Sequence, residues 1–228
     1  MKKLSLVLLG ALATAQVAQA APGAFNGFYL GGQLGWTQRN HKVDADKTWT
    51  QAARDSFKKN KKVNGMTYGL YTGYGQNNNG FYWGGEFGIE HSTANNKINC
   101  DFQTKEELRV GGILIHPANH KVELRYTYQR GVVFSLAPRL GAVIDNNNLI
   151  YAKLGMELSR DTAKLENAKA GKSKAVFVFV PSVGYERAFG NLLARVEYGY
   201  NTGGKIKYED ATVKYSAHVL KVGLAYKF

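Results

Sequence analysis

The consecutive residues Glu90, His91 and Ser92 have the side-chain types of a serine hydrolase's catalytic group. A serine hydrolase needs the serine hydroxyl, the imidazole and an orienting carboxylate within hydrogen-bond reach of one another. Successive side chains of an extended strand point to opposite faces, so His91 would face away from both neighbours. The spacing predicts no catalytic group, and we expect a protein that is not an enzyme. A serine and a histidine from different strands could still meet, which leaves an enzyme as an alternative.

Two further histidines, His116 and His120, have the spacing of metal ligands on one face of a helix. Pro117 lies between them and disfavours a helix, so a polar turn is the expected structure. The sequence also has no Gly-rich nucleotide-binding loop and no dense cluster of metal-ligating residues. We therefore expect no metal and no cofactor.

Six charged residues occupy positions where the surrounding alternation otherwise places small side chains. They are Glu86, Arg139, Lys153, Glu186, Arg195 and Glu197. An isolated buried charge is very costly, whereas three acids and three bases can neutralise one another. We expect them to form a salt-bridge network inside the protein that fills its interior. Charges solvated in open water are the alternative interpretation.

The elements that must position these charges are strands, because polar and apolar residues alternate with a period of two. In the last strand the outer face is largely apolar and the other face is small or charged. The two sets are Leu220, Val222, Leu224, Tyr226 and Phe228 against Lys221, Gly223, Ala225 and Lys227. Lipid on one side and a polar lumen on the other produce this pattern. The sequence predicts an all-β protein, a closed antiparallel transmembrane β-barrel.

The same alternation recurs along the chain and sets the number of strands. It is found in 28–37, 65–75, 81–89, 134–141, 150–158, 182–186 and 195–199. Short turns are expected at 77–80, 145–148 and 189–191, and long polar loops at 41–63, 92–130, 161–173 and 202–212. Short periplasmic turns and long extracellular loops are typical of outer-membrane barrels. We expect eight strands; 107–115 and 122–128 could form a protruding hairpin or two further strands, which would make ten.

The first twenty residues have the features of an export signal. Lys2 and Lys3 precede the uncharged stretch Leu4–Ala15, and Ala18-Gln19-Ala20 has the small-x-small pattern cleaved by signal peptidase. We expect cleavage before Ala21 and one barrel domain over 21–228. After the signal no apolar run approaches the length of a transmembrane helix.

The formal net charge is +13, and export makes a nucleic-acid partner a poor explanation for it. The densest basic run lies in the first expected loop and contains Lys58, Lys59, Lys61 and Lys62. These lysines could bind the phosphates of lipopolysaccharide or an anionic polysaccharide, or could only keep the loop solvated. Tyr29, Tyr68, Trp83, Tyr185 and Tyr226 are expected as anchors at the membrane–water interfaces.

Several stretches resemble the strands of OmpA-type and opacity-type outer-membrane barrels. They include 29–36, 83–88, 137–141, 151–155, 184–186, 194–198 and the C-terminal 222–228. The resemblance implies that Glu86, Arg139, Glu186 and Arg195 block or gate the lumen. It also implies that the terminal Phe228 is recognised by the barrel-assembly machinery. Gln33 departs from the family, which often has lysine there.

Together these features predict a structural scaffold in the outer membrane of a Gram-negative bacterium, with surface-interaction, adhesin-like loops and a plugged lumen. A narrow porin-like channel is the first alternative and a lipid A-modifying enzyme the second. The expected partners are outer-membrane lipids, lipopolysaccharide, the barrel-assembly machinery and host surface molecules.

Overall fold

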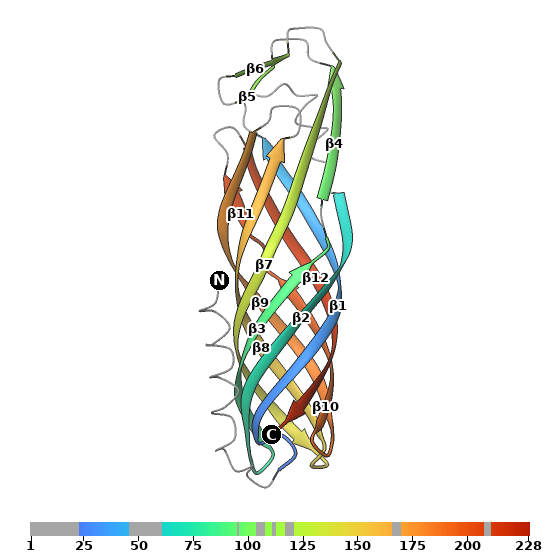
Figure 1. Cartoon of the computed structure of the whole chain (residues 1–228), viewed down its shortest axis with the longest axis vertical. Helices are drawn as coiled ribbons and strands as arrows, with labels where there is room; N and C mark the ends of the chain where they lie inside the picture. Colours follow the sequence, from blue (N-terminus) through green and yellow to red (C-terminus); the bar gives the residue numbers. More distant parts are fainter. Residues whose placement is uncertain are drawn as a thin grey trace, which may run out of the picture.

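The computed structural model describes residues 23–45, 61–94, 96–103, 108–110, 113–116, 121–165, 170–207 and 211–228. Every regular element in these ranges is a β-strand (Figure 1). None of the described residues belongs to a helix that is long and apolar enough to cross a membrane.

Eight of the strands form a closed antiparallel ring in the described part of the chain, in the order β1-β2-β3-β7-β8-β9-β10-β12. The ring closes because β1 pairs with β12 from Tyr29↔Lys227 to Ala45↔Ala211. Its members are β1 Gly27–Ala45, β2 Lys61–Asn78, β3 Phe81–Ser92, β7 Lys121–Ile144, β8 Asn148–Leu165, β9 Ala170–Phe189, β10 Leu192–Asn201 and β12 Ala211–Lys227. The predicted eight-stranded barrel is confirmed.

The remaining strands lie at one end of the barrel, where β4 and β11 extend its wall (Figure 1). β4 (Asn96–Gln103) pairs with β7, β11 (Lys205–Lys207) pairs with β12, and β5 (Leu108–Val110) pairs with β6 (Ile113–His116) in a separate small sheet. The segment 122–128 is therefore not a strand of its own, as both sequence interpretations assumed. It is the upper part of β7, and it pairs with β4 on one side and, at 126–128, with β8 on the other, rather than with 107–115.

Three tight turns gather at the other end of the barrel, where the chain also finishes (Figure 1). They lie at Asn79–Gly80, Asp145–Asn147 and Gly190–Asn191. Asn79 has a φ of 51° and Asn146 a φ of 58°, the left-handed conformation that asparagine, aspartate and glycine adopt most readily. Local sequence chemistry therefore determines this end of the barrel.

The strands run further toward the opposite end than the sequence predicted. β7 has 24 residues and β9 has 20, whereas crossing a membrane takes about 9–11 residues. Much of the loop expected at 161–173 is paired strand, from Asp161↔Lys174 to Leu165↔Ala170. Residues 41–45 and 61–63 are likewise strand. Beyond the apolar band both faces of a strand can be polar. The sequence there no longer alternates between polar and apolar residues, although the hydrogen bonding between strands continues.

The outer wall is covered with exposed large apolar side chains from all eight strands of the ring. Leu70 is 65% exposed and Val183 is 59% exposed. A protein surrounded by water rarely exposes an apolar surface of this extent. The alternation thus places the apolar face against lipid and the other face in the lumen.

Candidate functional site

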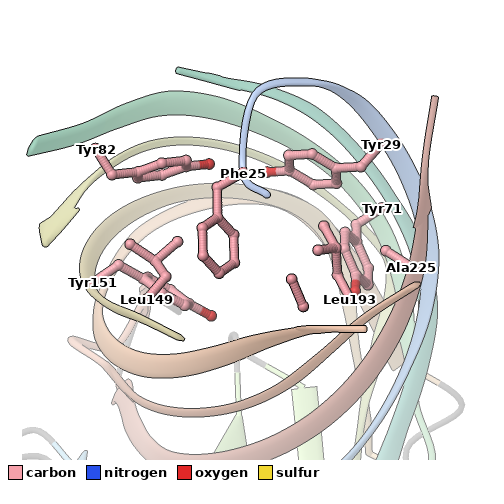
Figure 2. Packing of buried hydrophobic residues seen from close by; sticks show 9 residues of the cluster. Phe25, Tyr29, Tyr71, Tyr82, Leu149, Tyr151, Leu193 and Ala225 are labelled. Atoms are coloured by element: carbon pink, nitrogen blue, oxygen red, sulfur yellow. The ribbon is translucent and has the colours of Figure 1, made fainter. Parts of the chain in front are cut away.

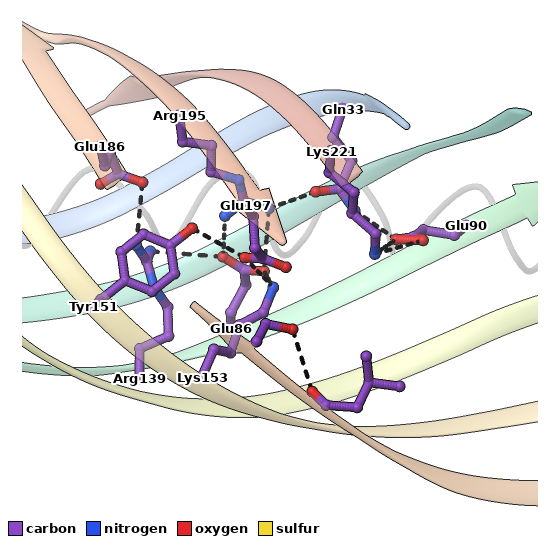
Figure 3. A network of polar contacts seen from close by, with 12 residues as sticks. Gln33, Glu86, Glu90, Arg139, Tyr151, Lys153, Glu186, Arg195, Glu197 and Lys221 are labelled. Atoms are coloured by element: carbon purple, nitrogen blue, oxygen red, sulfur yellow. Dashed lines mark hydrogen bonds and ion pairs between the residues drawn. The ribbon is translucent and has the colours of Figure 1, made fainter. Parts of the chain in front are cut away.

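Glu86 of β3 lies at the centre of the lumenal charges (Figure 3). Its carboxylate accepts a hydrogen bond from Arg195 Nη1 at 2.5 Å and lies 3.1 Å from Lys153 Nζ. Arg139 Nη1 lies 3.6 Å from the same carboxylate. Three cations therefore converge on one buried anion.

The two other acids predicted from the sequence balance this excess of positive charge. Glu186 accepts a hydrogen bond from Arg139 Nη2 at 3.2 Å, and Glu197 lies 2.7 Å from Lys153 Nζ. All six predicted residues are buried and lie within ion-pair distance of at least one opposite charge. Because buried charges are stable only when paired and hydrogen-bonded, each member depends on the others.

These contacts cross the lumen rather than following the wall. Glu86 is on β3 and Arg195 is on β10, and those strands are not neighbours in the ring. Arg139 of β7 reaches Glu186 of β9 past the intervening β8. The network therefore ties separate parts of the barrel wall together through its interior.

Tyrosine rings surround the two guanidinium groups. Arg139 Cζ lies 3.9 Å from the centroid of the Tyr151 ring, and Arg195 Cζ lies 3.5 Å from that of Tyr71. Such cation–π contacts contribute about 2 kcal/mol or more when water is excluded. Arg139 Nη1 also donates to Tyr29 Oη at 2.8 Å. Tyr29 was expected as an interfacial anchor. That prediction is wrong, because the side chains of the odd-numbered residues in this part of β1 point into the lumen, and Tyr29 is buried there.

The interior tyrosines lie over glycines of adjacent strands. Tyr151 of β8 is directly opposite Gly184 of β9, and a methyl group added to Gly184 would lie 2.3 Å from Tyr151 Cζ. Tyr29 and Tyr71 are opposite Gly73 and Gly31 in the same manner. A small residue on the wall therefore provides the space for each large ring inside a narrow barrel.

A second ion pair, which the sequence-based prediction omitted, lies next to the first cluster. Lys221 Nζ contacts both carboxylate oxygens of Glu90, at 2.9 Å for Oε2. Gln33 joins the two groups, because it donates to Glu90 Oε1 at 2.6 Å and accepts from Arg195 Nη2 at 2.5 Å. The same alternation that selected Glu86 and Glu197 also places Glu90 and Lys221 inside. Gln33 is thus a neutral connector between the two charged groups.

A third polar group lies further from the turns. Arg130 Nη2 contacts Glu157 Oε2 at 2.8 Å, and Ser159 Oγ donates to Asp161 at 2.8 Å. Arg130 could not be found from alternation, because the register of β7 against β8 shifts between Arg130 and Val133. One extra residue in such a β-bulge interrupts the alternation locally and brings Arg130 to the inner face.

The comparison with protein families settles what kind of barrel this is. The sequence matches a family described as outer membrane protein beta-barrel domain over residues 4–228. The chain belongs to that family. The protein is therefore located in the bacterial outer membrane. The match is to the general barrel domain, so the narrower resemblance to OmpA-type and opacity-type barrels stays a prediction.

Solved structures that are similar to this outer-membrane barrel have low sequence identity to it. The outer membrane protease OmpT from Escherichia coli is 10% identical with a TM-score of 0.50, covering 92% of this chain and 99% of OmpT. Neisserial surface protein A gives 10% identity and a TM-score of 0.48, covering 88% and 97%. The attachment invasion locus protein Ail of Yersinia pestis gives 16% and 0.41, covering 88% and 98%. Comparison with curated protein sequences finds no match.

The lumen of this outer-membrane barrel changes character at the end with the tight turns. An apolar cluster there contains Phe25, Tyr82, Leu149, Leu193 and Ala225 (Figure 2). The Phe25 and Tyr82 rings meet edge to face, with centroids 6.4 Å apart. An apolar layer thus lies below the ion pairs, and the alternation alone did not reveal it.

The other predicted site residues lie apart from the lumen. Lys62 of β2 is exposed, and Lys61 is paired with His41 in the ladder; Lys58 and Lys59 lie outside the described residues. The Phe228 side chain faces outward, and its backbone N–H donates to Phe28 O at 2.9 Å. The expected signal 1–20 also lies outside the described residues.

The candidate hydrolytic residues are separated by the barrel wall. Glu90 and Ser92 are buried inside the barrel. His91 is on the outer face, where the centroid of its ring lies 5.6 Å from that of the Tyr68 ring. His116 belongs to β6, and His120 lies outside the described residues. No group of three or more His, Cys, Asp or Glu side chains within the described ranges could hold a metal ion.

Proposed function

We propose that the protein is a non-catalytic membrane scaffold whose lumen is plugged and whose turn-distal segments bind molecules outside the cell. The observation that supports this most directly is the network centred on Glu86, in which lumenal charges contact one another across the barrel. Charges engaged in this way are poorly placed to bind a passing solute. Function then belongs to the parts that project from the membrane.

The orientation follows from the general architecture of outer-membrane barrels. Short turns face the periplasm in such proteins and the longer connections face outward. On that basis the turns at Asn79–Gly80, Asp145–Asn147 and Gly190–Asn191 are periplasmic. The extended upper parts of β7, β8 and β9 then stand above the membrane and carry the surface-interacting segments.

The partner chemistry we propose is anionic. Lys61 and Lys62 begin β2, at its extracellular end in this orientation, and Lys58 and Lys59 precede them in the sequence and complete the basic run. Clustered lysines attract phosphate or sulfate groups and lose much of that attraction as salt rises. Phosphates of lipopolysaccharide and anionic polysaccharides of a host surface have the required charge.

Binding by whole cells tests this role. Cells that display the protein should bind an immobilised sulfated polysaccharide, and replacing 46–60 with a short Gly-Ser linker should reduce binding at least fivefold. The Lys58, Lys59, Lys61 and Lys62 to Gln variant should weaken binding in the same direction, most clearly at low salt. The matched control changes Lys174, an exposed lysine of β9, to Gln. Equal binding by all variants would refute the surface role.

Conductance and lipid analysis separate the two alternatives. A plugged lumen predicts no channel events in planar bilayers containing the purified protein. Reproducible single-channel steps would favour the narrow channel instead. Lipid A from cells with and without the protein should have identical mass spectra, and a new modified species would favour the enzyme.

Export and assembly complete the proposal. We propose that signal peptidase cleaves before Ala21 and that the barrel-assembly machinery recognises the strand ending in Phe228. The intact mass of the protein purified from outer membranes tests the cleavage. A mass that includes residues 1–20 would contradict it.

A further inference from the structure

A short segment that precedes the first strand enters the lumen. Residues 23–26 come before β1, at the end of the barrel with the tight turns. Phe25 is only 3% exposed, although it belongs to no strand of the ring. Figure 2 shows its ring projecting into the space between Tyr82, Leu149 and Tyr151.

Specific polar contacts fasten this segment to the rim. Lys227 Nζ at the end of β12 donates to Gly23 O at 2.9 Å. The backbone N–H of Asn77, beside the β2–β3 turn, donates to Asn26 Oδ1 at 2.5 Å. The segment is thus held at two points of the rim that belong to different strands.

Gly27 allows the chain to change direction between β1 and the lumen. Its φ of +110° is a conformation that residues with a side chain rarely adopt. A methyl group added to Gly27 would also lie 3.2 Å from Phe228 O, at the closure between β1 and β12. The reversal into the barrel is therefore specified by one residue.

The segment and the charged network meet through shared tyrosines. Tyr29 and Tyr151 belong to the apolar cluster around Phe25 and also contact Arg139. An apolar layer that excludes water lowers the local dielectric constant and so strengthens the ion pairs beside it. The order from the rim inward is the Phe25 cluster and then the ion pairs.

We propose that residues 23–26 form a plug that closes the turn end of the lumen and shields the ion pairs from water on that side. It is a seal distinct from the ion-pair network, because it is apolar and is joined to the ring at Gly27, where the positive φ turns the chain into the lumen. The inference goes beyond the proposed surface role, which concerns the opposite end of the barrel.

Cysteine accessibility tests the plug. In a Cys100→Ser background, Ala188→Cys introduces a thiol into the apolar cluster at a position that is 5% exposed. Its reaction with a charged, water-soluble maleimide is followed in nanodiscs, after heat-modifiable migration has verified the folded barrel. We expect slow labelling with Phe25 present and labelling at least tenfold faster with Phe25→Ala.

Two controls restrict the interpretation to the plug. Phe28→Ala removes the nearby aromatic side chain that faces lipid, 42% exposed, and should leave the labelling rate unchanged. A thiol at Ser159→Cys, among the polar groups beyond the network, should react equally fast with and without Phe25→Ala. Equal labelling of Ala188→Cys in the parent and in Phe25→Ala would overturn the proposal, as would an equal acceleration by Phe28→Ala.

A second variant keeps the test decisive if Phe25→Ala does not fold. Asn26→Ala combined with Lys227→Met removes both rim contacts and leaves the Phe25 ring intact. It should accelerate labelling of Ala188→Cys at least threefold. An unchanged rate in this double variant would contradict a plug held by those contacts. The surface-binding assay is independent of all these outcomes, so failure here does not bear on the extracellular role.

Discussion

The Glu86 carboxylate and the Arg195 guanidinium meet inside the barrel at 2.5 Å, although they lie 109 positions apart in the sequence and on strands that do not pair. Glu86 also contacts Lys153 and Arg139, so its charge compensates several cations at once. Stability should therefore depend on Glu86 more strongly than on a residue of the outer wall.

We expect Glu86→Gln to lower the free energy of unfolding by about 3–5 kcal/mol, because it leaves buried cations without their shared anion. Urea titration of the barrel in lipid vesicles, followed by gel migration, measures the change. Phe87→Leu, at the adjacent lipid-facing position, is the control and should shift stability by about 0.5 kcal/mol. A loss below about 1 kcal/mol for Glu86→Gln would show that the network contributes little.

The Glu90–Lys221 pair should behave as a coupled unit. Lys221→Met alone removes the cation that faces the buried Glu90 carboxylate and leaves the neutral Gln33 amide as a donor to it. We expect a marked loss of stability for each single variant and a partial recovery in Glu90→Leu with Lys221→Met, since paired apolar groups often replace a buried ion pair without loss. A double-mutant cycle should give a coupling energy of about 1–3 kcal/mol. Additive single effects would contradict the pairing.

Two glycine substitutions should separate the inside of the wall from the outside. Gly184→Ala places a methyl group against the Tyr151 ring, and overpacking of this kind typically costs about 1–3 kcal/mol. Gly85→Ala meets no atom within 4 Å and faces lipid, so stability should be unchanged or higher by about 0.5–1 kcal/mol. Thermal unfolding in detergent measures both, and the opposite ranking would contradict the packing of the Tyr151 ring over Gly184.

The terminal aromatic side chain should matter for assembly in cells more than for stability. Phe228→Ala keeps the backbone hydrogen bond to Phe28 O, so refolding into detergent should proceed as in the parent protein. We expect the amount of folded protein in outer membranes to fall several-fold, because the substitution removes the side chain that we propose as the assembly signal. Phe81→Ala, another exposed aromatic at the same end of the barrel, is the control. Equal reductions in both variants would argue against a specific signal.

Much of the lumen could be assigned from the sequence because facing is a local property of a strand. Alternation predicts Glu86, Arg139 and Glu197 inside the barrel without reference to their partners, and all three are buried in the structure. Which charges pair with one another cannot be read from the local sequence. The pairing depends on how far the strands are staggered around the closed ring, because the stagger decides which side chains of β3 and β10 meet across the lumen.

Departures from the expected pattern have identifiable causes. Arg130 faces Glu157 because a register shift lies next to it in β7, and no pattern in the sequence marks that shift. The strand continues through 161–165 without alternation, because hydrogen bonding between strands requires no apolar face. Tyr29 was misassigned because aromatic residues occur both at membrane interfaces and inside narrow barrels.

The sequence by itself determined the transmembrane barrel, its tight turns and the facing of most strand residues, since these follow from the two-residue period and from the backbone preferences of Asn, Asp and Gly. Only the tertiary structure decided which charges meet, how the wall extends beyond the apolar band and that Phe25 enters the lumen. The physical reason is the range of the interactions: strand facing is set within a few residues, whereas a contact across a closed ring exists only once every strand has taken its register.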